Sequence, residues 1–222
     1  MCGRFTLAAE AAELQLEFDN VQLPSQFAPR YNIAPSQPVL ALLNSTSRTA
    51  DFLKWGLIPS WAKNPGIGNR LINARAETLG EKPAFRGAYK YKRCLILADG
   101  FFEWKSVPGA KVKVPYYIQL NDRKPFGLAG VWSEWHAADG SEMRSCTIVT
   151  TTPNELMASI HNRMPVILGR PDRELWLDAS PKEPKEVEHL LRPFPADAMR
   201  AIQVSTTVNN PENDRIECIL PV

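Results

Sequence analysis

The sequence lacks the features of membrane and exported proteins. It has no apolar run of about 18 residues, and its start, MCGRFTLAAE, has no basic patch followed by an apolar stretch. A transmembrane helix or a signal peptide would need one or the other. Internal repeats and low-complexity linkers are also missing. We therefore expect a cytoplasmic protein with no membrane partner, folded as a single domain over residues 1–222.

Residues that commonly bind metals are scarce. The chain has three histidines and four cysteines, and no two cysteines form a CxxC pair. This spacing excludes the common zinc motifs, so we expect no metal and no other cofactor. Cys94, Cys146 and Cys218 each lie in a strand-like run, and we interpret them as small buried apolar residues.

The charges are nearly balanced but unevenly distributed. The formal net charge is +2, yet the segment from Lys54 to Lys113 holds 12 basic and 4 acidic residues, leaving −6 for the rest. A basic segment of this kind is typical of a surface that binds a polyanion. Solvated surface lysines would give the same count, so the charge alone leaves both interpretations open.

Helical patterns occur in three places. Apolar spacing predicts a helix over Leu7–Phe18 with Thr6 as N-cap. The sequence from Thr152 to Glu155 is typical of a capping box and predicts a helix ending near Ile160. A last helix is predicted over Pro184–Leu191.

Strand-like segments outnumber the helical ones and do not alternate with them. This order disfavours a doubly wound parallel sheet and predicts an α+β fold, with a curled, largely antiparallel β core and peripheral helices. The proline-rich stretch 20–35 is expected to be a loop. The predicted strands are Val39–Leu43, Asp51–Gly56, Cys94–Ala98, Tyr116–Leu120, Gly127–Trp132, Cys146–Thr150, Ile202–Ser205 and Arg215–Leu220.

Cys2 has a chemistry that no internal residue offers. Removal of Met1 would leave an α-amine and a thiol on adjacent carbons. The amine, with a pKa of about 7.7–8.0, can attack an aldehyde to form a Schiff base, and the thiol can then close a thiazolidine ring. The thiol, with a pKa near 8.5, would need only a modest shift to supply thiolate. Alternatively, Cys2 is merely a small residue near a flexible terminus.

Glu103 lies in the aromatic stretch ADGFFEW. If it faces inward, poor solvation would raise its pKa toward the range useful for proton transfer. Strand alternation equally allows a solvent-facing Glu103 beside inward Phe102 and Trp104.

His161 is the histidine with the most informative position. It follows the helix predicted after Thr152, where the helix dipole favours the protonated ring. It is therefore a candidate for proton transfer, or a histidine that only caps the helix. His136 and His189 lie in polar stretches and are interpreted as surface residues.

Asn73 and Arg75 share one face of the segment INARAET if it is extended. An amide and a guanidinium on one face can orient a sugar and hold a phosphate. The alternative is a turn asparagine and an ion pair between Arg75 and Glu77.

Tryptophans lie within the basic segment, a pattern that suits stacking on unpaired bases. We expect core positions for Trp55, Trp132 and Trp176, whereas Trp61 and Trp104 fit either a core or a binding position.

The motifs taken together resemble the SOS response-associated peptidase (SRAP) family. The resemblance spans most of the chain, in the family's order, through MCGRF at the start, YNIAPSQ at 31–37, KWGLIPSW at 54–61, INARAET at 72–78, ADGFFEW at 98–104 and HNRMP at 161–165. It implies a single α+β domain that captures abasic sites in single-stranded DNA as a thiazolidine crosslink through the N-terminal cysteine, shielding the lesion.

The resemblance also implies roles for individual residues. Cys2 would be the nucleophile, and Glu103 the acid or base that also assists autoproteolytic removal of Met1. His161 would handle protons during ring opening and reversal. Asn73 would position the terminus and the sugar.

The implied DNA contacts are spread along the chain. Arg4 and Arg75 resemble phosphate contacts, and Trp61 and Trp104 would stack on or wedge between bases. The family can carry a further phosphate-binding arginine after the Asn-Ala-Arg motif. Here that position is bracketed by Lys82 and Arg86, and the sequence leaves open which of the two serves.

The expected partner is single-stranded DNA containing abasic sites, bound by a monomer with no obligate protein partner and associated with the nucleoid during DNA damage. Two other functions remain open. A cysteine with a histidine and an asparagine could act as a peptidase or amidase. The chain could also be a non-covalent reader of modified or damaged bases.

Overall fold

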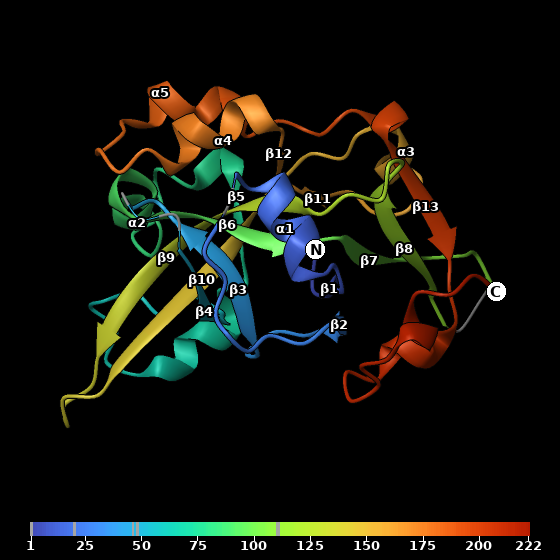
Figure 1. The fold of residues 1–222 in the computed structure, drawn as a ribbon, viewed down its shortest axis with the longest axis horizontal. Helices are drawn as coiled ribbons and strands as arrows, with labels where there is room; N and C mark the ends of the chain where they lie inside the picture. The colour runs from blue at the N-terminus through green and yellow to red at the C-terminus, as the bar shows by residue number, and fades with distance from the viewer. Residues whose placement is uncertain (1, 20, 46, 48, 110–111) are drawn as a thin grey trace.

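The computed structural model describes residues 2–19, 21–45, 47, 49–109 and 112–222. Two β-sheets form the body of the molecule, and short helices lie around them (Figure 1). The expected α+β fold with a curled, mostly antiparallel core is confirmed.

The larger sheet closes into a small barrel. The ring is made by pairing β10 with β4, β4 with β3, β3 with β6, β6 with β9, and β9 with β10 again. All these pairs are antiparallel except β4 with β10. The five strands are β3 (Pro38–Leu43), β4 (Ala50–Trp55), β6 (Arg93–Ala98), β9 (Phe126–His136) and β10 (Glu142–Thr151).

Three short strands extend this sheet. β5 (Asn73–Arg75) pairs with β10 in parallel, β11 (Met164–Pro165) pairs with β10, and β12 (Ile167–Leu168) pairs with β9. Because β10 pairs with both β5 and β11, the INARAET and HNRMP motifs lie beside the same barrel strand.

The second sheet has five antiparallel strands in the order β13, β8, β7, β1, β2. Their bounds are β1 (Phe5–Leu7), β2 (Arg30–Ile33), β7 (Gly100–Lys105), β8 (Val114–Leu120) and β13 (Met199–Gln203). One apolar cluster runs through both sheets, since Phe5 and Phe101 belong to the same buried group as Leu95 and Ile148 of the barrel. A smaller cluster lies on the other side of β7, against the C-terminal segment.

The helices are short. They are α1 (Ala11–Glu17), α2 (Arg86–Tyr91), α3 (Glu155–Ala158), α4 (Arg170–Leu177) and α5 (Pro184–Val187). α4 and α5 lie together at the top of Figure 1, and α2 lies at the left. Of the helices described, none is long and apolar enough to cross a lipid bilayer.

The first predicted helix begins too early. Residues 5–7 form β1, and the helix begins at Ala11 with Glu10 as N-cap. Thr6 is fully buried, and its hydroxyl hydrogen-bonds to Asp99 and, at 3.0 Å, to the hydroxyl of Tyr117. Pairing with β7 therefore overrides the helical apolar spacing at this end.

The other differences are also local. α3 begins two residues later than predicted, because Asn154 Oδ1, not Thr152, accepts the capping hydrogen bond from the Met157 amide at 2.9 Å. The predicted strand Arg215–Leu220 is wrong, since residues 216–218 form a 3₁₀ turn. The expected loop 20–35 contains β2.

The remaining predicted strands are confirmed within a few residues, and the helix expected over Pro184–Leu191 is α5 followed by a 3₁₀ turn, Glu188–Leu190. Cys94 and Cys146 are fully buried in strands, as expected, and Cys218 is buried in the 3₁₀ turn. Trp55 and Trp176 are core residues, whereas Trp132 is only half-buried.

Candidate functional site

Cys2 lies just before β1 and is completely buried. Its carbonyl oxygen accepts a hydrogen bond from Asn73 Nδ2 at 2.8 Å, which links the start of the chain to β5. The structure thus brings two of the candidate residues into direct contact. Met1, whose removal the family resemblance implies, lies outside the described residues.

Burial raises the pKa of the Cys2 thiol far above its usual range, and the Glu103 carboxylate raises it further. The shift needed to supply thiolate is therefore larger than the modest one expected from an ordinary thiol pKa. A thiol enclosed in an apolar core and facing a carboxylate is held in its neutral form.

Strand alternation allowed Glu103 to face either inward or toward solvent, and in the structure it faces inward. It shares a face of β7 with Phe101, which packs in the main core, and its side chain is only 2% exposed. Since β1 pairs with β7 and the Phe102 amide donates to the Arg4 carbonyl at 2.9 Å, the residues before β1 run alongside Glu103.

Burial raises the pKa of Glu103 to about 7, against the smaller, opposing effect of Lys113. A carboxyl group with this pKa is present in both protonation states near neutral pH. It can therefore either donate or accept a proton.

His161 follows α3 and is half-buried. Its Nδ1 accepts a hydrogen bond from the Arg163 amide at 3.1 Å. Burial lowers the pKa of His161, and Lys113 lowers it further. The expectation of a protonated ring is therefore wrong in direction, because burial and the nearby Lys113 cation both favour the neutral ring.

Arg163 is a site residue that sequence reasoning missed. Its guanidinium forms a bidentate ion pair with Glu77 (2.6 and 2.9 Å) and donates to the Thr150 carbonyl at 2.6 Å. It fixes the turn that carries His161 against β10 and the end of β5. Its place two residues after His161 in the HNRMP motif was the available signal. Because Glu77 pairs with Arg163, the alternative pairing with Arg75 is not adopted.

An open groove brings four of the predicted residues together. It has a volume of about 610 Å³, and Trp61, Asn73, Arg75 and Lys82 are among its lining residues. Trp61 is 60% exposed, and no acidic residue is among the described residues that line the groove. Asn73 Oδ1 is buried and has no hydrogen-bond partner among the described residues.

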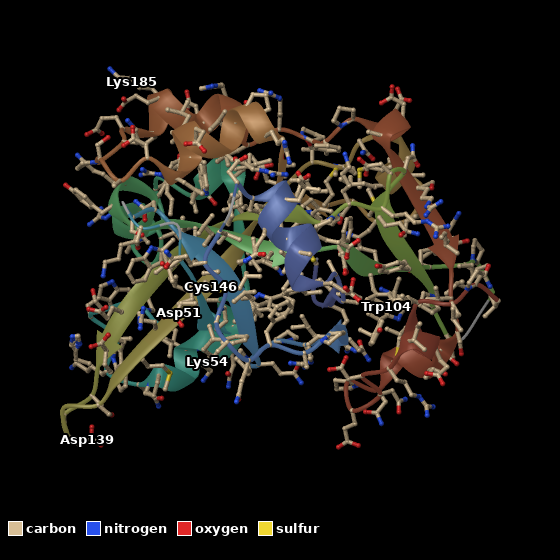
Figure 2. The ribbon with its side chains drawn as sticks, in the orientation of Figure 1. Asp51, Lys54, Trp104, Asp139, Cys146 and Lys185 are labelled. Atoms are coloured by element: carbon tan, nitrogen blue, oxygen red, sulfur yellow. The ribbon has the colours of Figure 1, made fainter. Side chains whose placement is uncertain are left out.

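Arg4 and Trp104 are not among the residues that line this groove. Trp104 lies beside the C-terminal segment (Figure 2), where its Nε1 donates to Asn209 Oδ1 at 2.7 Å. Arg4 Nη1 donates to Asn32 Oδ1 (2.7 Å) and to the Val208 carbonyl (2.8 Å), and its guanidinium lies 5.8 Å from the Trp104 ring centroid. Both side chains hold the C-terminal segment against the second sheet.

The two cations left open by the sequence are separated. Lys82 lines the groove with Asn73 and Arg75, whereas Arg86, at the start of α2, lines a neighbouring pocket.

One group of side chains in the described part of the chain could hold a metal ion. The ligand atoms of Glu134, His136 and Glu142 lie within 4.8 Å of one another on the β9–β10 hairpin. His136 and Glu142 are exposed, and none of the candidate residues around Cys2 belongs to this group.

The fold and the site define a class of α+β protein in which a cysteine before the first strand is buried beside a carboxylate and held by an asparagine of the neighbouring sheet. The sequence profile described as "SOS response associated peptidase (SRAP)" matches residues 1–211. This chain belongs to that family, as its motifs predict.

Similar proteins cover the whole chain. The abasic site processing protein YoqW of Bacillus subtilis (strain 168) is 46% identical over 222 residues, with 99% of each chain covered. The abasic site processing protein HMCES of Gallus gallus is 31% identical, covering 100% of this chain and 78% of the relative. A crystal structure of a Bacteroides thetaiotaomicron protein has a TM-score of 0.88 at 28% identity, with both chains covered completely.

Proposed function

We propose that this protein processes abasic sites in single-stranded DNA by capturing them covalently through Cys2 after Met1 has been removed. The observation that carries the proposal is the placement of Cys2. Its carbonyl oxygen accepts a hydrogen bond from Asn73, and the buried Glu103 carboxyl raises the pKa of its thiol. The relatives named for abasic site processing support the choice of substrate.

The first chemical step joins the terminal amine to the sugar. An acid opens the cyclic sugar to its aldehyde, the Cys2 amine attacks the aldehyde carbon, and one water leaves to give an imine. Glu103, with a pKa of about 7, suits this step because it can protonate the ring oxygen and later the departing hydroxyl.

The second step closes the ring. The Cys2 sulfur adds to the imine carbon, and the proton of the thiol ends on the nitrogen, so the product is protein plus DNA minus one water. Because burial keeps the thiol neutral, a base must accept its proton as the carbon–sulfur bond forms, and ionised Glu103 suits this task. The sulfur is tethered beside the imine carbon and should intercept it before β-elimination breaks the strand.

Two further residues have assigned roles in this proposal. Asn73 positions the Cys2 backbone through its Nδ2 and offers its unpartnered Oδ1 to a sugar hydroxyl. His161, held neutral by burial, exchanges protons during ring opening and reversal. Glu103 is also the candidate for assisting autoproteolytic removal of Met1.

DNA would lie in the groove, with Arg75 and Lys82 on phosphates and the exposed ring of Trp61 on a base. Arg4 and Trp104 are proposed only as DNA contacts outside the groove, because both side chains already form hydrogen bonds within the protein. We further propose a cytoplasmic monomer that associates with the nucleoid during the SOS response.

Intact mass tests the covalent step. The protein is mixed with a single-stranded oligonucleotide bearing one abasic site, and we expect a species of mature protein plus oligonucleotide minus water. Cys2→Ala and an intact strand should give none. Cys2→Ser should give an imine that reduction traps but no stable adduct. Crosslinking by Cys2→Ala at the wild-type rate would refute the mechanism.

The two alternatives make opposite predictions in the same experiment. A peptidase would turn over peptides and would not stay attached to an aldehyde. A non-covalent reader would bind equally well with Cys2→Ala.

Arg75 tests the DNA groove separately from the chemistry. Arg75→Gln should weaken strand binding and lower the slope of log K against log salt by about 0.7, the value for one lost phosphate contact on a single strand. The adduct should still form at saturating DNA. Titration of binding at several salt concentrations measures this, and an unchanged slope would contradict the placement of Arg75 on a phosphate.

A further inference from the structure

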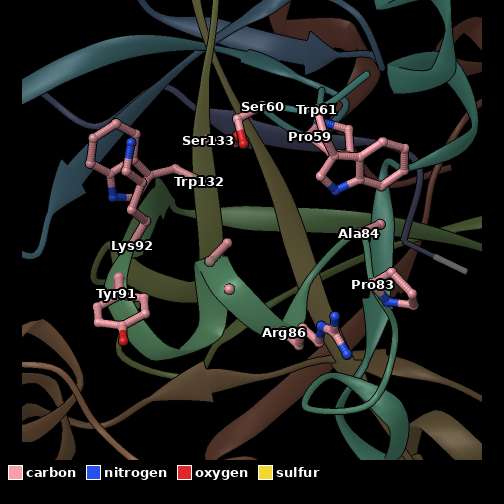
Figure 3. Close-up of a pocket in the computed structure, with 12 residues that line it drawn as sticks. Pro59, Ser60, Trp61, Pro83, Ala84, Arg86, Tyr91, Lys92, Trp132 and Ser133 are labelled. Carbon is pink, nitrogen blue, oxygen red and sulfur yellow. The ribbon is translucent and has the colours of Figure 1, made fainter. Parts of the chain in front are cut away.

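A second pocket adjoins the groove (Figure 3). It has a volume of about 390 Å³ and shares three residues with the groove, namely Trp61, Pro83 and Ala84. These residues form a common wall between the two hollows. A strand that leaves the groove across this wall would enter the second pocket. We call this second pocket the aromatic pocket.

The aromatic pocket is lined by rings that are unusually open to solvent. Trp61 is 60% exposed and Tyr91 is 54% exposed, while Trp132 is half-buried. Figure 3 shows Trp61 and Trp132 on opposite sides of the opening. Large exposed rings that converge on one hollow mark a binding site, and their flat faces suit an unpaired base.

The walls are held in place before any ligand arrives. Trp132 Nε1 donates to Asn44 Oδ1 at 3.2 Å, and Asn44 Nδ2 donates to the Tyr91 carbonyl at 3.1 Å. The Lys92 ammonium lies 4.6 Å from the centroid of the Trp132 ring. Since these contacts already order the Trp132 ring, stacking a base on it would cost little side-chain entropy.

The charges of the two hollows are complementary to a nucleic-acid strand. Arg86 and Lys92 line the aromatic pocket, and Arg75 and Lys82 line the groove. No aspartate or glutamate is among the described residues lining either one. A strand could therefore pass from one to the other without meeting a carboxylate, and successive phosphates would meet successive cations.

We propose that the aromatic pocket is a second nucleotide site, which receives an unpaired base of the strand that flanks the abasic site, with Arg86 on its phosphate. This inference rests on the proposed function, because capture at Cys2, which Asn73 links to the groove, would fix the position of the strand. It also gives the two cations separate tasks, Lys82 close to the abasic site and Arg86 further along the strand.

A fluorescence scan locates the base. Wild-type protein is crosslinked to strands that carry the abasic site and one 2-aminopurine, placed at successive positions on either side. We expect quenching at one or two adjacent positions on one flank, through stacking on Trp132, which lines only the aromatic pocket. Trp132→Leu should restore the fluorescence at those positions and leave adduct formation unchanged.

Binding of intact strands tests the same site without capture. Arg86→Gln should raise the Kd of a long strand about fivefold. The Kd of a short strand that fills only the groove should not change. Arg192→Gln is the matched control, because it removes an arginine that is paired with Asp172 of α4 and does not line the pocket. An equal loss for short and long strands would overturn the inference.

The possible failures are distinguishable. If adducts form but 2-aminopurine fluorescence is uniform along both flanks, the second site is refuted and the proposed function stands. If no adduct forms with protein that has lost Met1, the proposed function is refuted and this inference with it.

Discussion

The two faces of strand β7 serve different purposes. Phe101 and Glu103 point into the main core, where Glu103 acts on the buried thiol of Cys2. Phe102 and Trp104 point the other way and pack with the C-terminal segment, where Trp104 bonds to Asn209. One short motif, ADGFFEW, therefore holds two interleaved sets of residues.

One strand can thus carry both a side chain suited to chemistry, Glu103, and a side chain that stabilises the fold, Trp104. Full burial on one face makes Glu103 a weak acid with a pKa of about 7. On the other face, the half-buried Trp104 makes an ordinary hydrogen bond that stabilises the fold. We expect substitutions on the first face to change chemistry and substitutions on the second face to change stability.

The largest effect should come from Glu103→Gln. The amide keeps the shape but cannot exchange a proton, so the rate of adduct formation should fall by about a hundredfold or more. The rate is measured by intact mass on protein whose mass shows that Met1 is gone, while binding of an intact strand serves as the control. A rate within a few fold of wild type would remove Glu103 from the chemistry.

The free energy of unfolding of the protein should depend on pH through Glu103 on the same face. The pKa of Glu103 is raised from about 4.3 in the unfolded chain to about 7 in the folded one. Its contribution to stability is thus fully present below pH 4.3 and is lost as the pH rises through 7. Relative to Glu103→Gln, wild type should lose on the order of 3 kcal/mol between pH 4 and pH 8. Urea unfolding at both pH values measures this, and a constant difference would contradict it.

The smallest effect should come from Trp104→Phe on the opposite face. The change removes the Nε1 donor to Asn209 and keeps most of the ring, so unfolding should become easier by about 1 kcal/mol. The rate of capture at saturating DNA should not change. A large loss of that rate, with stability preserved, would show that both faces of β7 serve the chemistry.

Local patterns predicted much of the β core. Runs such as Val39–Leu43 and Cys94–Ala98 are strongly apolar and bounded by turns, and they form β3 and β6. Local patterns gave the wrong secondary structure where pairing with a distant strand determines it. The stretch after Thr6 has helical spacing, but its start is recruited into β1 by β7 and by the buried bonds of Thr6.

The candidate residues were found by type and motif, whereas their states depended on the fold. Alternation could not choose the face of Glu103, because both sides of β7 are covered. The direction of the pKa shift at His161 depended on burial and on Lys113, which is far away along the chain. The pairing of Arg163 with Glu77 joins residues far apart in the sequence, which no local pattern reveals.

The pairing of β10 has a consequence for how the molecule folds. The β3–β4 and β9–β10 hairpins join neighbouring segments and can form early, but the barrel closes only when β10 meets β4, which lies far away along the chain. Contacts of such high sequence separation form slowly. Because β5, with Asn73 and Arg75, also pairs with β10, the groove too depends on a strand pairing between distant parts of the chain. A chain with only the two hairpins formed would thus lack the groove proposed for DNA.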